Sequence, residues 1–150
     1  MTYGKDPSDH GTEPTAGGDA TTEQRIAAAR AYIDALVSHD ASAVPLAPDA
    51  VRYEMGLKTG RSGAHIARSL ERGPQFRVIE GVRDVTAWRE GETVRTRYAI
   101  DTTVLGVNLV VAQVTEEFEV RGDAAIHRID ARIRPRPGPV FRRRGRGRKG

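Results

Sequence analysis

The side chains of this sequence that could do chemistry are mainly tyrosines and carboxylates. The strongest candidates are Tyr32, Tyr53, Glu54, Tyr98 and Asp101. A carboxylate in an apolar setting can accept or donate a proton, and a buried phenol can donate a hydrogen bond to a developing negative charge. This combination is typical of a pocket that moves protons on a small molecule.

Other chemistries lack the residues they need. The chain has no cysteine, which excludes disulfides, thiol catalysis and thiolate metal sites. Its four histidines are too scattered to form a ligand spacing, so we expect no metal and no other cofactor. Residues 56–62 resemble a phosphate-binding loop, but three residues separate the glycines where the motif needs four. The sequence also contains no nucleophile elbow and no dinucleotide-binding fingerprint.

A helix is expected to position Tyr32. Thr21 is followed three residues later by Gln24, a spacing that predicts a capping box at the start of a helix. Apolar residues then recur at helical spacing as far as Leu36, and Tyr32 lies on the same stripe. We therefore expect a helix from Thr21 to about Asp40, with Tyr32 facing the interior.

The rest of the chain predicts one short helix and a run of strands. A strand at 50–54 and a turn at 59–63 precede a helix that Ser62 caps and Gly73-Pro74 ends. Alternation of apolar and polar residues then predicts strands at 76–80, 83–89, 93–103, 107–120 and 124–133. Helices followed by an antiparallel meander indicate an α+β fold with the helices on one face of the sheet.

Both ends of the chain differ in composition from the middle. Residues 1–20 are rich in glycine, proline and small polar residues, which bury too little surface to order a chain. Of the 24 lysines and arginines, eight lie in residues 134–150, leaving 16 basic against all 20 acidic groups in residues 1–133. We expect a disordered segment at 1–20, one domain at 21–134 and an Arg-rich disordered tail at 135–150.

The basic tail suggests a partner of its own. Its charges could neutralise phosphates, giving weak binding to nucleic acid or anionic lipid without sequence preference. The alternative is a solvated tail that only improves solubility. The candidate polyanion-binding residues are Arg142, Arg143, Arg144, Arg146, Arg148 and Lys149.

The location is predicted from two absences in the sequence. No segment approaches the ~18 apolar residues of a membrane-spanning helix. The start of the chain also lacks the apolar run of a signal peptide. These observations favour a cytoplasmic protein.

The layout of a capped helix, a strand, a short helix and a run of strands resembles the NTF2-like superfamily, which includes SnoaL-like proteins, ketosteroid isomerases and limonene-epoxide hydrolases. The resemblance implies an α+β cone, with N-terminal helices packed on a curved antiparallel sheet around a mainly apolar pocket, and a homodimer. The superfamily contains enzymes, binding proteins and plain dimerisation modules. The architecture therefore does not identify the activity.

Residues 32–54 are similar to ketosteroid isomerases. Tyr32 matches the oxyanion-hole tyrosine of that family, eight residues before an aspartate that Asp40 matches. Glu54 falls near the general base of that family, after a two-residue deletion. The second oxyanion donor of the family, a protonated aspartate, has no match, because the register that aligns Phe118 puts Val114 at its position.

Residues 34–41 are at least as similar to limonene-epoxide hydrolases. Tyr53 matches the tyrosine on the first strand of that family, and Asp101 and Asp130 fall at its two acids. Ala99 falls where the family has an arginine, although Arg97 lies one strand repeat away on the same side. Strand alternation places both aspartates on the face opposite the apolar residues, unless a bulge shifts the register.

The resemblance thus implies Glu54, Tyr32, Tyr53 and Asp101 as catalytic residues, with Glu54 as the preferred proton acceptor. It implies a pocket lined by Tyr98, Trp88, Ile129 and His127, with Trp88 closing it. Each assignment has a structural alternative: a core tyrosine for Tyr32, a rim carboxylate paired with Arg52 for Glu54, and a solvated ion pair for Asp101.

Two hypotheses of function follow. In the first, the domain binds a small apolar metabolite and converts it as an isomerase or an epoxide hydrolase. In the second, it is a non-catalytic module that dimerises through its sheet and holds an anionic partner, such as nucleic acid, with its basic tail. Dependence of binding on the tail would distinguish them.

Overall fold

The computed structural model describes residues 18–104 and 107–136, without the side chains of residue 104 and residues 107–110. The predicted segments at 1–20 and 135–150 fall largely outside these ranges. The proposed limits of the domain therefore remain a prediction. Within the described ranges, no helix is long and apolar enough to cross a membrane.

Helix α1 (Thr22–Ser38) begins at the predicted capping box. The Gln24 amide donates to Thr21 Oγ1 at 3.2 Å, and the Thr21 amide donates to Gln24 Oε1 at 2.9 Å. The helix ends at His39, whose φ of 56° breaks the helical backbone. Tyr32 is on the buried side with Ile33 and Leu36, as the spacing predicted.

The sheet has six strands in the order β2-β1-β6-β5-β4-β3. Strands β3 to β6 form an antiparallel meander, as predicted, but the strands predicted at 76–80 and 83–89 are one strand, β3, and residues 74–77 are helical. In addition, β1 pairs with β6 in parallel, so the sheet is mixed and not wholly antiparallel. The predicted turn at 59–63 begins within strand β2, which pairs with β1 as a hairpin. The strands are β1 (Leu46–Glu54), β2 (Leu57–Gly60), β3 (Ile79–Glu90), β4 (Thr93–Val104), β5 (Val107–Val120) and β6 (Ile126–Arg136).

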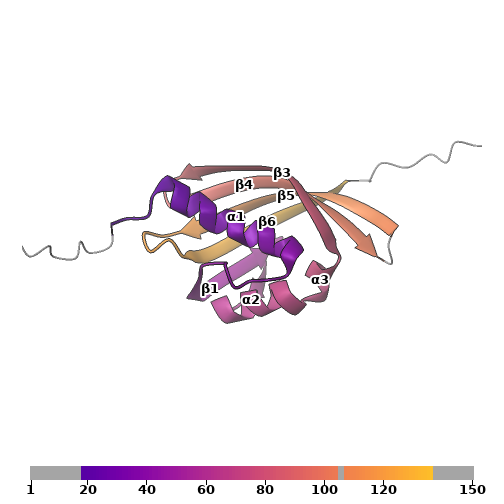
Figure 1. The fold of residues 1–150 in the computed structure, drawn as a ribbon, viewed down its shortest axis with the longest axis horizontal. Coiled ribbons are helices and arrows are strands. Elements are labelled where there is room, and N and C mark those ends of the chain that lie inside the picture. The colour runs from indigo at the N-terminus through magenta and orange to yellow at the C-terminus, as the bar shows by residue number, and fades with distance from the viewer. Residues whose placement is uncertain (1–17, 105–106, 137–150) are drawn as a thin grey trace, which may run out of the picture.

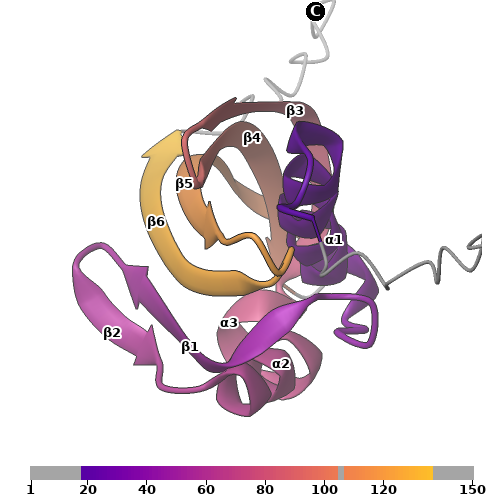
Figure 2. The same ribbon diagram turned by 90° about the vertical axis from the view of Figure 1, so that its left-hand side faces the viewer.

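Two further helices follow β2. Ser62 caps α2 (Gly63–Arg72) by accepting a hydrogen bond from the His65 amide at 3.1 Å. Gly73 ends this helix, and Pro74 begins the single turn of α3 (Pro74–Arg77). Figure 1 shows α1 lying across the sheet, and Figure 2 shows strands β3 to β6 curling around it with α2 and α3 at one side. The fold is the expected α+β cone.

Strict alternation of buried and partly buried residues along β5 distinguishes the inner face of the sheet from its outer face. Its even-numbered residues from Ala112 to Val120 are buried, and the odd-numbered residues between them are only partly buried. Four of these five buried residues are apolar, and the fifth is Glu116. The inner face of the sheet therefore carries an acid in its core.

Candidate functional site

A small cavity lies where α1, α3 and the inner face of the sheet meet. Its walls are mostly aliphatic and aromatic side chains, and its polar lining residues are Tyr32, Glu54, Tyr98 and Glu116. The cavity has a volume of about 40 Å³. That is room for a few water molecules, since one water needs roughly 10–15 Å³.

Glu116 is the most unusual residue of this cavity. It projects inward from β5 between Val114 and Phe118, and only 2% of it is exposed. Burial raises the pKa of its carboxyl to about 8, against the lowering effects of a hydrogen bond from Tyr98 and the charge of Arg52. At neutral pH the side chain is therefore mainly a carboxylic acid, which can donate a proton or a hydrogen bond.

Two neutral phenols flank this acid. Tyr98, on the neighbouring strand β4, donates its hydroxyl proton to Glu116 Oε1 at 2.8 Å. The Tyr32 ring packs edge-on against Phe118, with 5.3 Å between the ring centroids. Burial, with the nearby Glu116 carboxyl, raises the pKa of both tyrosines well above the ordinary value, so both stay protonated.

Arg52 organises the other polar side of the cavity. Its fully buried guanidinium lies 2.9 Å from Glu54 Oε1 and donates to Tyr32 Oη at 3.3 Å. It also donates to both the hydroxyl and the carbonyl oxygen of Thr59 on β2, and stacks 4.9 Å from the centroid of the Phe76 ring. The strand pair β1-β2 thus fixes one arginine that holds a carboxylate and a phenol in place.

Glu54 lies at the edge of the cavity, with 21% of its side chain exposed. In addition to its ion pair with Arg52, it accepts a hydrogen bond from Thr59 Oγ1 at 3.1 Å. The cavity therefore combines a carboxylate held by a cation with an acid kept neutral by burial. Such a pair can act as general base and general acid on one substrate.

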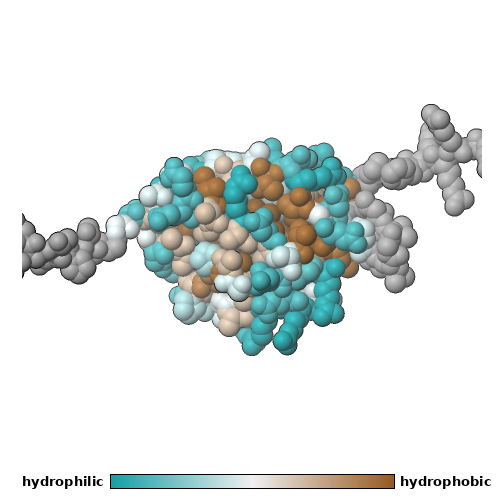
Figure 3. Space-filling model, in the orientation of Figure 1, coloured by the Kyte–Doolittle hydropathy of each residue, from teal (hydrophilic) through white to brown (hydrophobic). Residues whose placement is uncertain are grey.

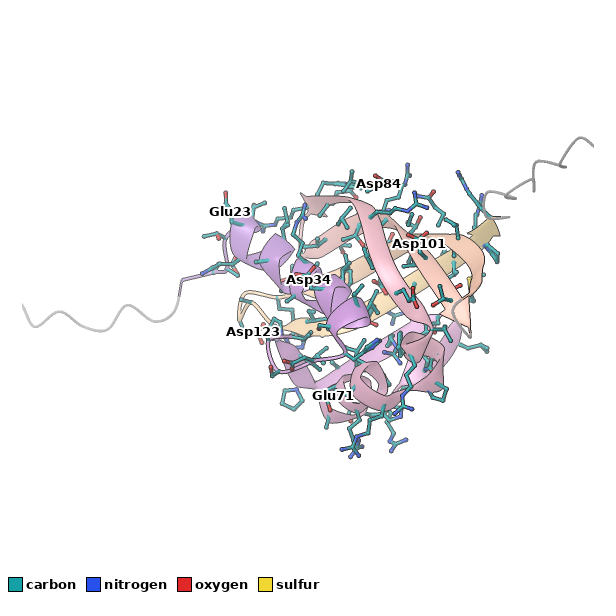
Figure 4. The ribbon with its side chains drawn as sticks, turned by 45° about the vertical axis from the view of Figure 1, so that its right-hand side comes forward. Glu23, Asp34, Glu71, Asp84, Asp101 and Asp123 are labelled. Atoms are coloured by element: carbon teal, nitrogen blue, oxygen red, sulfur yellow. The ribbon has the colours of Figure 1, made fainter. Side chains whose placement is uncertain are left out.

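Two of the predicted catalytic residues lie outside the cavity, on the opposite face of the sheet. The Tyr53 ring stacks under the guanidinium of Arg128 at 4.5 Å. Asp101, labelled in Figure 4, accepts two hydrogen bonds from Arg83, both at 3.0 Å. No bulge reverses the phase of Asp101 relative to its inward neighbour Ile100, so the solvated ion pair expected from alternation is present.

Of the predicted pocket residues, one lines the cavity and the others do not. Tyr98 lines the cavity, whereas Ile129 is buried in the core without lining it. Trp88 shares the outer face with Arg95 and is 39% exposed, so it does not close the cavity. A register shift at the start of β6 turns Ile126 inward, and His127, with 13% of its side chain exposed, pairs with Asp123 at 2.8 Å and does not line the cavity.

The residues proposed to bind polyanions, 142–149, lie outside the described residues, so their role remains a prediction. Within residues 18–104 and 107–136, no group of three or more histidines and carboxylates is close enough to hold a metal ion.

Sequence reasoning missed Glu116 and used Arg52 only as an alternative partner for Glu54. A signal for Glu116 was present, because it alternates in phase with the apolar Val114 and Phe118. Arg52 lacked so clear a signal, because it alternates in phase only with Ala50 and the charged Glu54.

An α+β cone with helices against a curved sheet is the NTF2-like fold. Residues 19–133 match the family described as "Domain of unknown function (DUF8021)", and the chain belongs to this family. No curated protein sequence matches the chain.

Solved structures share this fold. An LEH-like epoxide hydrolase of Mycobacterium tuberculosis is 23% identical with a TM-score of 0.62, over 75% of this chain and 84% of that one. A de novo designed protein with a curved β-sheet is 16% identical with a TM-score of 0.62, over 77% and 89%. A Kribbella flavida protein provisionally described as a ketosteroid isomerase is 20% identical with a TM-score of 0.57, over 78% and 85%. Sequence identities this low establish the fold alone, so the activity must be argued from the residues of the site.

Proposed function

We propose that the cavity binds a small, largely apolar molecule with an oxygen acceptor, and that Glu54 and Glu116 transfer protons on it. One observation carries the proposal: an acid with a pKa of about 8 and a carboxylate paired with Arg52 line the same apolar cavity. Opposite protonation states of two acids are the arrangement that acid-base catalysis needs.

With a carbonyl compound, the reaction would be an isomerisation. Glu54 would remove a proton from the carbon next to the carbonyl group, while the Glu116 hydroxyl donates a hydrogen bond to the carbonyl oxygen. The resulting enolate would be stabilised in a site of low dielectric constant, where such a bond is strongest. Glu54 would then return the proton to another carbon atom, so the substrate and product have the same composition.

With an epoxide, the same residues would catalyse hydrolysis. Glu116 would protonate the ring oxygen as one carbon–oxygen bond breaks, and Glu54 would remove a proton from the water that attacks the carbon. The names of the structural neighbours include both kinds of enzyme, which supports testing both substrates.

The cavity must widen to admit either substrate, because pockets for small molecules usually measure about 300–1,000 Å³. Phe76, on the one-turn helix α3, and Leu36, near the end of α1, belong to its wall. Figure 3 shows apolar residues at the surface beside the C-terminal half of α1. We propose that ligands enter here by displacing Phe76 and Leu36.

A thermal-shift screen of the full chain with small cyclic enones, steroids and terpenoid epoxides tests the proposal, with turnover of each hit followed by chromatography. A ligand at 100 times its Kd should stabilise the protein by about 2.7 kcal/mol. Glu54→Gln and Glu116→Gln should keep the shift and lose turnover. Glu117→Gln, one residue along on the outer face, is the matched control.

The outcomes are separable. A product with the composition of the ketone and a shifted double bond identifies isomerisation, and a diol identifies epoxide hydrolysis. Turnover that survives both cavity substitutions would overturn the acid-base assignment, and a screen without a hit would contradict the small-molecule proposal. Dimerisation through the sheet, binding by the tail and a cytoplasmic location stay predictions.

A further inference from the structure

The outer face of the sheet, opposite the cavity, separates its charges along the strands. At one end, Arg95 pairs with Glu90 and Glu117 at 2.8 Å each, and Arg128 pairs with Asp130 at 2.7 Å. Positive charge at this end is therefore matched by carboxylates. The other end of the same face carries one acid, Asp101, which is paired with Arg83.

There, four exposed arginines have no ion-pair or side-chain hydrogen-bond partner among the described residues. They are Arg97 on β4 and Arg132, Arg134 and Arg136 on β6. Together with Gln113 and Thr115 of β5, they line a trough of about 380 Å³ that contains no acid. We call this feature the arginine trough.

The register of the strands explains the shape of the trough. Thr115 lies opposite both Arg97 and Arg132, and Gln113 lies opposite Arg134. The floor is therefore formed by shorter, uncharged side chains. Three arginines of β6 rise on one side, and Arg97 rises on the β4 side, where Ala99 lies opposite Gln113. Because adjacent strands lie about 4.8 Å apart, the two walls are separated by about 10 Å. An extended, narrow anion fits such a channel better than a flat anionic surface would.

From these observations we propose that the arginine trough binds the phosphodiester backbone of nucleic acid without reading its sequence. The guanidinium group is planar and pairs with phosphate through two parallel hydrogen bonds. Alternate residues of β6 repeat every 6.6 Å or so, and they supply a row of such groups along the channel. No aromatic residue lines the trough, so base stacking adds nothing.

Two other occupants fit the trough less well. Membrane surfaces are usually bound through apolar side chains as well as charge, and the trough has no apolar lining residue. A twofold dimer centred on the trough would bring the same four unpaired arginines of both copies together, where they would repel one another. In the sequence, the basic residues 142–149 follow the last described residue, Arg136.

Fluorescence anisotropy of the full chain with oligothymidylate and oligouridylate of equal length tests the proposal. Each phosphate contact to a single strand contributes about −0.7 to the slope of log K against log salt concentration. Arg132→Gln combined with Arg134→Gln should weaken binding and make the slope less negative by about 1.4. Arg132→Lys with Arg134→Lys should retain the slope, since lysine keeps the charge.

The matched control is Arg95→Gln with Arg128→Gln, which removes two paired arginines from the same face and should leave the slope unchanged. An unchanged slope in the trough variant would assign binding to the tail and overturn the proposal. So would trough-dependent binding to phosphatidylserine vesicles without binding to oligonucleotides, or a dimer that excludes them. Equal slopes for the two oligonucleotides support recognition of the shared backbone.

Discussion

Replacing Glu116 with glutamine should make the protein more stable at about pH 8 and leave it nearly unchanged at about pH 5. In the folded state the pKa of Glu116 is about 8, and its ordinary value is 4.5. Between these values the folded protein holds a proton that the unfolded chain has released. Wild-type stability should therefore fall as the pH rises through this window, and level off above it.

The size of the effect follows from the shift in pKa. A difference of 3.5 pH units between 4.5 and 8 corresponds to about 5 kcal/mol, because one unit is worth 1.36 kcal/mol. Most of this change, about 3 to 4 kcal/mol, falls between pH 5 and pH 8. Glutamine has no proton to lose, and its carbonyl oxygen can still accept the hydrogen bond from Tyr98.

Urea denaturation at a series of pH values, followed by circular dichroism, measures the difference. The free energies of unfolding of wild type and Glu116→Gln should converge near pH 5 and diverge at about 1.4 kcal/mol per pH unit above it. Parallel curves would refute the assignment of a buried, protonated acid. Glu117→Gln serves as the control, and an equal divergence for it would show that burial at position 116 is not the cause.

Two further predictions concern the elements that hold the site. Arg52→Met should reduce the free energy of unfolding, measured by urea titration, by about 3 kcal/mol or more, because it leaves Glu54 without its cation. Exposed Arg128→Met should reduce it by less than about 1 kcal/mol. Equal reductions for the two variants would contradict this reasoning. Thr21→Ala should lower stability by about 1 kcal/mol through loss of the cap on α1, and an unchanged melting temperature would show that Gln24 suffices alone.

The parts of the fold that depend on local rules could be predicted. A capping box and a helical stripe determine α1, and alternation determines β4, β5 and β6 but divided β3 into two strands and missed α3. The parallel pairing of β1 with β6 could not be predicted in the same way. It joins residues far apart in the chain, and an isolated strand carries no local signal for its partner or direction.

The site could be predicted only in part, for related reasons. Tyr32 and Tyr98 lie in phase with apolar neighbours, and both line the cavity. His127 also lies in phase with apolar residues, but the register shift at the start of β6 moves it outside. One extra residue in a strand cannot be recognised from the alternation of apolar and polar residues. It nevertheless moves the side chains that follow it to the opposite face of the sheet.

The stability cost of Glu116 bears directly on its function. At pH 7 the raised pKa costs the fold about 3 kcal/mol, a large part of the 5–15 kcal/mol that stabilises a typical domain. Such costs are found where a protein needs a group in an unusual protonation state. The proposed role therefore requires one substitution to do two things: Glu116→Gln should gain stability at neutral pH and lose turnover. A gain in stability with full activity would make the acid a structural feature of the core and move the search for the proton donor to Tyr32 and Tyr98.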